Sequence, residues 1–334
     1  MKKLRPSGLS LSRAIDGFLQ FKAAESLAKG TLVSYRQHLD GLKTWLEDDE
    51  CVVQDISTQL LCKYLVYLRE EYVPRRITGH NDKPLSPKTI HNVWISLSAF
   101  FTWASTEFEF ANPMKGVPVP KFQKVAVEVY TKEQIEALLK ACDHCSEAQV
   151  TDRRKYTPPR WSAKRDRAMI MMLLDCGLRA NELCSLKIGD IDIKTGKVDI
   201  KHGQECGAKG GKGRVVFMGK ATRRVVWRYL ADRVDGNDHT APLFLARADR
   251  PMRKDALRQL IVSLGKRAGV KHSHPHRFRH TFAITYLRSG GDVFTLQALL
   301  GHGSLDMVQH YARIAQVDVE NAHRRASPAD NWHL

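Results

Sequence analysis

The stretch HSHPHRFRH, residues 272–280, crowds histidines and arginines around a single phenylalanine. His274 precedes Pro275, and a capping side chain followed by proline is typical of a helix N-terminus. Like charges on one helix face repel each other by roughly a few tenths of a kcal/mol per pair. An anion at the helix start, where free N–H groups point outward, would relieve that repulsion. The candidates are a phosphate, an acidic protein partner, or solvent around an exposed basic face.

The predicted helix has two distinct faces. Phe278, Phe282 and Tyr286 recur every four residues, which predicts a buried apolar stripe. His276 and Arg279 lie three residues apart on another face, in the first turns of the helix. This second face therefore offers two side chains that suit a phosphate.

The composition points to a polyanionic partner. The chain has 334 residues, with 53 Lys and Arg against 36 Asp and Glu, which gives a net charge of +17. That length allows two domains, and the charge suits nucleic acid, although a merely soluble basic protein is an alternative. No apolar run approaches the ~20 residues of a membrane span. The N-terminal MKKLRPSGLSLS lacks the apolar core of a signal peptide. We expect a soluble, cytoplasmic protein with no membrane partner.

The first third of the chain predicts a small all-helical domain, residues 1–111. Apolar residues recur at helical spacing over about 10–25 and 30–48. Ser57 is placed to cap a third helix, and Ser86 with the proline after it opens a fourth.

A linker and a second domain follow. Residues 112–128 contain three prolines and no helical period, which is typical of a linker. In residues 129–334, the segments IDIKTGKVDI and GRVVFMG alternate like strands, whereas most of the remainder has helical periodicity. We therefore expect a mainly α protein with a small antiparallel β-sheet.

The seven cysteines do not predict a disulfide framework, because they are odd in number and scattered. Cys142 and Cys145, with His144 between them, raise the alternative of a zinc site. A structural zinc site usually needs a second ligand pair at regular spacing, and none is evident. We expect no metal and take the spacing as that of an ordinary helix end.

Two further motifs place functional side chains at helix boundaries. In DCGLRANELCSL, Arg179 follows the helix-stopping Gly177, and Glu182 lies one turn on, where it could orient a neighbour or form a surface salt bridge. In LLGHGSLDMVQHYARI, His302 follows a second helix-ending glycine and Tyr311 comes nine residues later. An ordinary turn histidine and a half-buried tyrosine are the alternatives for the last two.

Taken together, GLRANEL, HRFRHTFA, LLGHGSLDMVQHYAR and NPMKGVP resemble the tyrosine recombinases of the lambda-integrase type, close to the XerC/XerD-like site-specific recombinases and integrases. The resemblance extends from about residue 10 to 320. Its specific part is HxxRH, then LGH, then the tyrosine; the polar stretch 146–165 is longer than is usual in the family. The resemblance implies a two-domain, C-shaped clamp, with a helical SAM-like core-binding domain and a catalytic domain.

The family also uses a lysine on a β-hairpin, and GAKGGKGRVVFMG matches that pattern. Aligned on Gly210 and Arg214, the lysine is Lys209, with Lys212 as the alternative and alanine in place of the usual glycine at position 208. A phosphate-binding P-loop is excluded, because no Ser or Thr follows the Gly-Lys pair and strands rather than a helix flank it.

The resemblance implies a site-specific DNA recombinase that cuts and rejoins duplex DNA through a covalent 3′-phosphotyrosyl intermediate. Tyr311 would be the nucleophile and His276 the base that takes its proton, because a free tyrosine has a pKa near ~10. Arg179 and Arg279 would bind the non-bridging phosphate oxygens, and His302 would add a hydrogen bond. Lys209 would protonate the leaving 5′-oxygen. Because the covalent bond conserves the ester energy, no metal, ATP or other cofactor is required.

The same resemblance implies double-stranded DNA recombination sites as partners, and a tetramer formed when each C-terminal segment docks on a neighbour. Integration, excision and resolution of DNA elements are all compatible. A type IB topoisomerase shares the chemistry without synapsis, and an inactive DNA-binding protein is a further alternative. A covalent protein–DNA adduct on a gel would separate the enzymes from the inactive protein.

Overall fold

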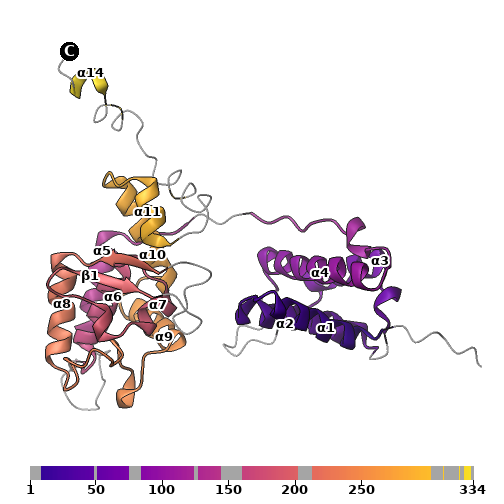
Figure 1. Ribbon diagram of the computed structural model, residues 1–334, viewed down its shortest axis with the longest axis horizontal. Helices are drawn as coiled ribbons and strands as arrows, with labels where there is room; N and C mark the ends of the chain where they lie inside the picture. The colour runs from indigo at the N-terminus through magenta and orange to yellow at the C-terminus, as the bar shows by residue number, and fades with distance from the viewer. Residues whose placement is uncertain are drawn as a thin grey trace, which may run out of the picture. The chain divides into compact units, whose positions relative to one another are not determined.

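The computed structural model describes residues 9–48, 51–74, 84–123, 127–143, 160–201 and 213–301, together with Tyr311, His323 and residues 327–331. The chain divides into two compact units, Met1–Val125 and Ala126–Leu334 (Figure 1). This division falls inside the stretch that the sequence predicts as a linker.

The first unit is helical, as predicted. Its described residues form α1 (Leu11–Ala24), α2 (Lys29–Leu46), the 3-10 helix η1 (Val53–Asp55), α3 (Thr58–Glu70), α4 (Pro87–Glu107) and the 3-10 helix η2 (Pro113–Gly116). In Figure 1, α1 and α2 make one layer, and α3 and α4 make the other. The predicted caps are confirmed: the hydroxyls of Ser57 and Ser86 accept hydrogen bonds from the backbone N–H of Leu60 and Thr89, at 3.2 and 3.1 Å.

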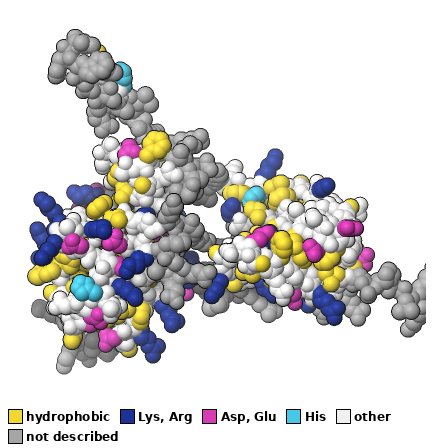
Figure 2. Space-filling model, in the orientation of Figure 1, with side chains coloured by type: hydrophobic (Ala, Val, Ile, Leu, Met, Phe, Trp, Pro, Cys, Tyr) yellow, Lys and Arg dark blue, Asp and Glu magenta, His cyan; other side chains and the backbone are white. Residues whose placement is uncertain are grey.

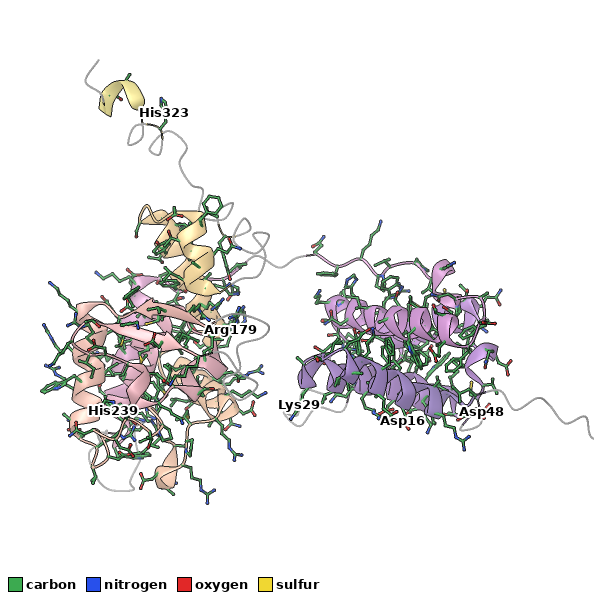
Figure 3. All side chains as sticks on the ribbon, in the orientation of Figure 1. Asp16, Lys29, Asp48, Arg179, His239 and His323 are labelled. Carbon is green, nitrogen blue, oxygen red and sulfur yellow. The ribbon has the colours of Figure 1, made fainter. Side chains whose placement is uncertain are left out.

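An aromatic cluster fills the space between these helices. The Phe18 ring meets the Phe100 ring edge-on at a centroid distance of 5.5 Å, and the Trp103 ring lies 5.6 Å from it. Such pairs contribute about 0.5–1.5 kcal/mol beyond the burial of their area. Figure 3 shows side chains packed between the two layers. The first unit therefore has its own apolar core.

Both ends of the predicted linker, 112–128, pack onto the unit beside them. Met114 and Val117 are buried in the core of the first unit. Val127 and Val129 pack against buried residues of the second unit.

The second unit combines helices with one small sheet, which confirms the predicted fold class. Its described elements are α5 (Lys132–Asp143), α6 (Ala163–Cys176), α7 (Ala180–Ser185), η3 (Ile188–Asp190), β1 (Lys197–Ile200), β2 (Arg214–Phe217), α8 (Lys220–Ala231), η4 (Arg247–Asp249), α9 (Lys254–Arg267), α10 (Pro275–Arg288), α11 (Val293–Leu300) and α14 (Pro328–Asn331). Helix α6 packs against α5, α8 and α10. Strands β1 and β2 are antiparallel, with Lys197 opposite Phe217 and Ile200 opposite Arg214.

The strand predicted over IDIKTGKVDI is shorter than expected. Only its last four residues, Lys197–Ile200, form β1. Before them, the Asp192 carboxylate accepts hydrogen bonds from the backbone N–H of Lys194, at 2.8 Å, and from the Thr195 hydroxyl, at 2.6 Å. These local bonds offer the backbone a turn in place of a strand.

The ends of α6 and α10 are fixed as the sequence predicts. Helix α6 ends at Gly177, whose φ of +60° favours glycine and whose added Cβ would lie 2.4 Å from the Phe282 ring. Helix α10 begins after His274, whose Nδ1 accepts a hydrogen bond from the Arg277 N–H at 3.2 Å. On α10 the predicted buried stripe is confirmed for Phe278, whereas Phe282 and Tyr286 are partly buried and pack against a core cluster of the second unit.

In the ranges that the structure describes, no helix combines the length and the apolar character that a membrane crossing demands.

Candidate active site

The second unit holds the predicted catalytic residues that the structure describes: Arg179, His276, Arg279 and Tyr311. Figure 3 places Arg179 at the edge of this unit. Lys209, its alternative Lys212, and His302 lie outside the described residues.

Glu182 fixes Arg179 at the start of α7. One of its carboxylate oxygens accepts the Arg179 backbone N–H at 2.8 Å, and the other accepts Nη1 of the Arg179 side chain at 2.8 Å. The Glu182 side chain is fully buried, whereas that of Arg179 is 30% exposed. The alternative of a surface salt bridge is therefore wrong for Glu182. Its buried carboxylate holds both the backbone and the side chain of Arg179 in place.

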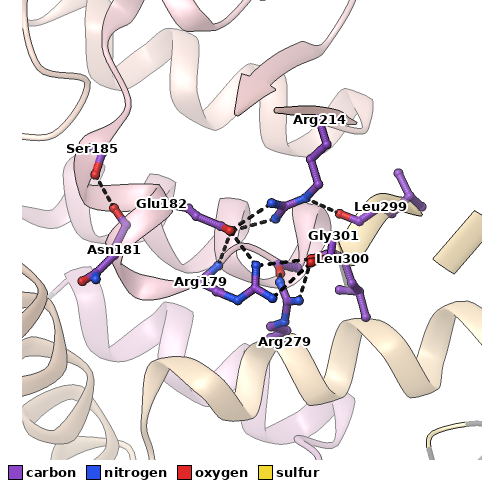
Figure 4. A network of polar contacts seen from close by, with 10 residues as sticks. Arg179, Asn181, Glu182, Ser185, Arg214, Arg279, Leu299, Leu300 and Gly301 are labelled. Carbon is purple, nitrogen blue, oxygen red and sulfur yellow. Dashed lines mark hydrogen bonds and ion pairs between the residues drawn. The ribbon is translucent and has the colours of Figure 1, made fainter. Parts of the chain in front are cut away.

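A second arginine binds the same carboxylate. Arg214, the first residue of β2, donates from Nη1 and Nη2 to the two oxygens of Glu182 at 2.9 and 2.7 Å (Figure 4). This two-point geometry matches a planar guanidinium to a planar carboxylate. The sequence identified Arg214 only as a marker for the hairpin register, so its place in the site is a finding of the structure.

Three arginines, Arg179, Arg214 and Arg279, donate hydrogen bonds to carbonyl groups at the C-terminus of α11. The carbonyl of Leu299 accepts from Nε of Arg214 at 2.7 Å, and that of Leu300 accepts from Arg279 at 2.7 Å and from Arg179 at 3.4 Å (Figure 4). The last carbonyls of a helix have no partner within the helix, and they carry the negative end of its dipole. The helix end therefore stabilises a cluster of cations.

Gly301 closes this helix end tightly against the cluster. Its φ is +62°, and an added Cβ would lie 3.0 Å from Cδ of Arg214. A side chain at this position would be strained by the backbone conformation and would crowd the Arg214 side chain, so both backbone and packing favour glycine here.

Burial and mutual repulsion shape the ionisation of the cluster. The Arg279 side chain is fully buried, and its Nη1 donates to the Gly177 carbonyl at 2.8 Å. Burial and the nearby Arg179 charge lower the pKa of Arg279 to about 9, so it stays protonated near neutral pH. Burial alone would raise the pKa of Glu182, but Arg214 and Arg179 outweigh it and lower that pKa to about 2. Three guanidinium groups around one carboxylate leave a positive surplus that suits a phosphate.

A basic groove opens beside the buried cluster. Arg179 and His276 line it together with Asn181 of α7, Arg258 of α9 and His274. His276 is exposed to solvent on this side. Partial loss of water around its ring, and the charges of Arg279, His274 and Arg179, lower the pKa of His276, so the ring is neutral near pH 7. Lys and Arg side chains also protrude elsewhere on the surface (Figure 2).

Tyr311 is fully buried, and its hydroxyl lies 2.8 Å from Nδ1 of His280. Burial raises the pKa of Tyr311, while the charges of Arg279 and Arg179 oppose that rise. The sequence names His276 as the base for Tyr311, and that role stays a prediction; the contact of the Tyr311 hydroxyl with His280 is a finding of the structure. The available signal was the spacing of four residues, which puts both histidines on one face of α10.

The zinc alternative gains no support in the part of the chain that the structure describes. Cys142 is buried in the core of the second unit, while His144 and Cys145 lie outside the described residues. Across the described ranges, no group of three or more His, Cys, Asp or Glu side chains is arranged to hold a metal ion.

Comparisons with known proteins identify the family of the chain. Residues 128–317 match the model of the phage integrase family, and residues 14–110 match that of the phage integrase SAM-like domain. The chain is 28% identical over 308 residues to tyrosine recombinase XerC of Xylella fastidiosa, covering 91% of this chain and 93% of that relative. It is 25% identical over 318 residues to tyrosine recombinase XerC of Staphylococcus epidermidis, covering 92% of this chain and 96% of the relative.

A solved structure shares the fold. The Tn1549 transposon integrase in complex with a circular intermediate DNA aligns with a TM-score of 0.69 at 20% identity, covering 91% of this chain and 95% of that one. The integrase family model alone spans more than half of the chain. The chain therefore belongs to the phage integrase family of tyrosine recombinases, and it is a site-specific recombinase, an enzyme that cuts and rejoins DNA.

Proposed function

We propose that this recombinase breaks one DNA strand by attack of the Tyr311 hydroxyl oxygen on a backbone phosphorus. The new P–O bond to tyrosine forms as the bond to the 5′-oxygen breaks, which leaves a 3′-phosphotyrosyl enzyme and a 5′-hydroxyl. The reverse attack by a 5′-hydroxyl from a second site completes strand exchange. The observation that supports this assignment best is that Arg179 and Arg279 converge on the Leu300 carbonyl while their charges act on Tyr311.

In this proposal the arginine cluster binds the phosphate undergoing attack. Arg179 is the partly exposed member and lines the basic groove, so it meets the phosphate first. Arg279 lies deeper and stabilises the charge that grows on the non-bridging oxygens in the transition state. His302 adds a hydrogen bond to the same oxygens. Each well-placed donor contributes about 3 kcal/mol to transition-state stabilisation, by analogy with a single oxyanion-hole donor.

Two proton transfers accompany the exchange. His276 is the sequence-based candidate for the base, and its lowered pKa keeps it neutral near pH 7, as a base must be. Lys209 is the candidate acid that protonates the leaving 5′-oxygen. The ester energy stays in the phosphotyrosyl bond, so the reaction requires no metal and no cofactor.

The proposed assembly is a tetramer on two double-stranded recombination sites, in the cytoplasm. The two units would bind duplex DNA as a clamp, as the resemblance to the family implies. The C-terminal segment of each subunit would dock on its neighbour. The net charge of +17 supports binding to a polyanion.

A covalent-trapping assay tests the proposed nucleophile. The DNA carries a nick just to the 3′ side of the cleavage point, so that the short fragment with the new 5′-hydroxyl diffuses away and the adduct accumulates. Wild-type protein should form the adduct in excess EDTA, whereas Tyr311→Phe should bind the same DNA and form none. Adduct formation by the Phe variant would refute Tyr311, and loss of the wild-type adduct in EDTA with recovery in Mg²⁺ would refute the metal-free mechanism.

The two hairpin lysines are distinguished by a substrate with sulfur in place of the 5′-bridging oxygen, because a thiolate leaves without a proton. Lys209→Ala should bind normally, cleave ordinary DNA poorly and recover on the sulfur substrate. Lys212→Ala is the matched control, and it should gain nothing from sulfur. Rescue of the Lys212 variant instead would identify Lys212 as the acid.

A further inference from the structure

The immediate surroundings of Tyr311 contain a histidine that the proposed mechanism does not use. The Tyr311 hydroxyl and Nδ1 of His280 are 2.8 Å apart, within hydrogen-bond distance. A phenol is a better proton donor than a neutral imidazole, so the hydroxyl donates and Nδ1 accepts. This arrangement requires the tautomer of His280 that carries its proton on Nε2.

His280 and His276 occupy different depths on one face of α10. They are four residues apart, and their rings meet edge to face at a centroid distance of 4.4 Å. His276 is exposed and lines the basic groove with Arg179, whereas His280 is partly buried and contacts Tyr311. The outer histidine therefore faces the space where a phosphate would enter, and the inner one faces the nucleophile.

The charges around Tyr311 favour transfer of its proton at this position. Arg279 is adjacent to His280 in the sequence, and its charge and that of Arg179 favour a phenolate at Tyr311, against the effect of burial. The phenolate would form inside the protein, where bulk water cannot take the proton because the side chain is fully buried. An acceptor within the protein is therefore needed, and Nδ1 of His280 is in contact with the hydroxyl.

We propose that His280, rather than His276, takes the proton of the Tyr311 hydroxyl during strand cleavage. The inference rests on the proposed role of Tyr311 as nucleophile. The O–H bond of Tyr311 breaks and an N–H bond forms at Nδ1 of His280. The phenolate oxygen bonds to phosphorus, and the 5′-oxygen leaves with a proton from the acid. In the rejoining step His280 returns its proton to the departing tyrosine, while His276 contacts the phosphate.

The test combines a near-isosteric variant with a more acidic nucleophile. His280→Asn places an amide oxygen near the position of Nδ1, so it still accepts a hydrogen bond but takes no proton. A ring-fluorinated tyrosine incorporated at position 311 has a lower hydroxyl pKa and depends less on a base. The rate of covalent adduct formation is measured on the nicked DNA for each combination, and His276→Asn is the matched control.

With ordinary tyrosine, His280→Asn should slow adduct formation by at least about 100-fold, the usual minimum for a lost general base. With the fluorinated tyrosine, the same substitution should cost less than about 10-fold, because the more acidic hydroxyl needs a base less. The loss caused by His276→Asn should be the same with either nucleophile.

Three results would overturn the proposal: an equal loss with both nucleophiles, a wild-type rate for His280→Asn, or a rate faster than wild type, which would make the contact a restraint on Tyr311. DNA affinity and circular dichroism establish that the variants fold, and His280→Ala, which also removes the proton acceptor, replaces His280→Asn if the Asn variant does not fold. Tyr311→Phe separates the two levels of the argument. An adduct formed without the Tyr311 hydroxyl refutes the nucleophile itself, whereas an inert Phe variant beside a fully active His280→Asn refutes only the role of His280.

Discussion

The core of the first unit and the site of the second are both buried, but by opposite kinds of side chain. In the first unit, rings such as those of Phe18 and Phe100 exclude water from one another. In the second, Arg279 is among the largest fully buried side chains. All the buried charged residues of the described ranges lie in the second unit: Asp166, Glu182, Asp190, Arg277 and Arg279.

The apolar core of the first unit is suited to stabilising a fold, whereas the buried charges of the second unit are suited to a function. Burying apolar area stabilises a fold by roughly 25 cal/mol per Å². Burying an ion costs several kcal/mol unless its partners are well placed, and replacing a buried ion pair by apolar groups is often neutral or stabilising. The arginine cluster is therefore a poor way to stabilise a domain. Its positive surplus makes sense if a phosphate completes it.

The largest expected effect comes from removing the carboxylate at the centre of the cluster. Glu182→Ala leaves Arg214 buried without a counter-ion and should destabilise the second unit by about 3–5 kcal/mol. Asp166 is the matched control, because it is also fully buried and is held by Arg160 and Arg165 at 2.8 Å each. Thermal unfolding should report similar losses for Glu182→Ala and Asp166→Ala.

The two variants should differ in the rate of adduct formation, which is measured at a temperature where both are folded. It should fall by about 100-fold or more for Glu182→Ala, because Arg179 loses its orientation, the cost expected for a transition-state donor. It should be preserved for Asp166→Ala. Equal losses of activity would mean that burial of charge in general, and not this cluster, supports the chemistry.

Acid should weaken the second unit through Glu182. The pKa of this carboxyl lies at about 2, below its usual value of 4.5. A lowered carboxyl pKa stabilises the fold above the unfolded value, and that stability is lost as the pH falls toward the folded value. The unfolding temperature of the second unit should therefore drop between about pH 5 and pH 2. Glu182→Gln should start lower and depend less on pH. A wild-type pH profile in the Gln variant would contradict the pKa assignment.

A smaller effect should follow from a substitution that keeps the positive charge at position 214 but removes the planar guanidinium group. Arg214→Lys retains the positive charge, yet an ammonium group cannot hold both oxygens of Glu182 and the Leu299 carbonyl together. The cost to stability should be about 1.5–3 kcal/mol, the range for hydrogen bonds to charged groups. Arg165→Lys, at the Asp166 cluster, should cost as much in thermal unfolding. Only the Arg214 variant should slow adduct formation.

The smallest effect concerns two glycines, one in each unit. Gly30 of α2 has no other atom within 4 Å of an added Cβ, so Gly30→Ala should stabilise the first unit by up to about 1 kcal/mol. Gly301→Ala should destabilise the second by about 1–2 kcal/mol, because φ is +62°. Denaturant titration measures both. Stabilisation by Gly301→Ala would show that α11 does not need this tight end.

Local signals made much of the fold predictable. The caps at Ser57 and Ser86 and the helix stop at Gly177 are each set by a few neighbouring residues, and all three are confirmed. The shortened β1 was missed because the side chain of Asp192 forms a turn where the alternation of apolar residues favours a strand.

The site was predictable only in part, because its contacts join distant segments. Arg179 and Arg279 were identified from motifs, and their meeting at Leu300 depends on how α7, α10 and α11 pack. The bonds from Arg214 to Glu182 span 32 positions of the chain, and no local pattern encodes them. The choice between His276 and His280 depends likewise on where Tyr311 lies, which spacing along α10 does not specify.

Tyr311 is proposed to become covalently joined to DNA, and mass spectrometry of the trapped wild-type adduct locates that bond on a single residue. Trypsin cuts after Arg288 and Arg313, and the peptide between them contains Tyr311 as its single tyrosine. This peptide alone should gain the mass of the DNA fragment, on Tyr311. Attachment to a serine, to a different tyrosine, or to no residue at all would contradict the proposal.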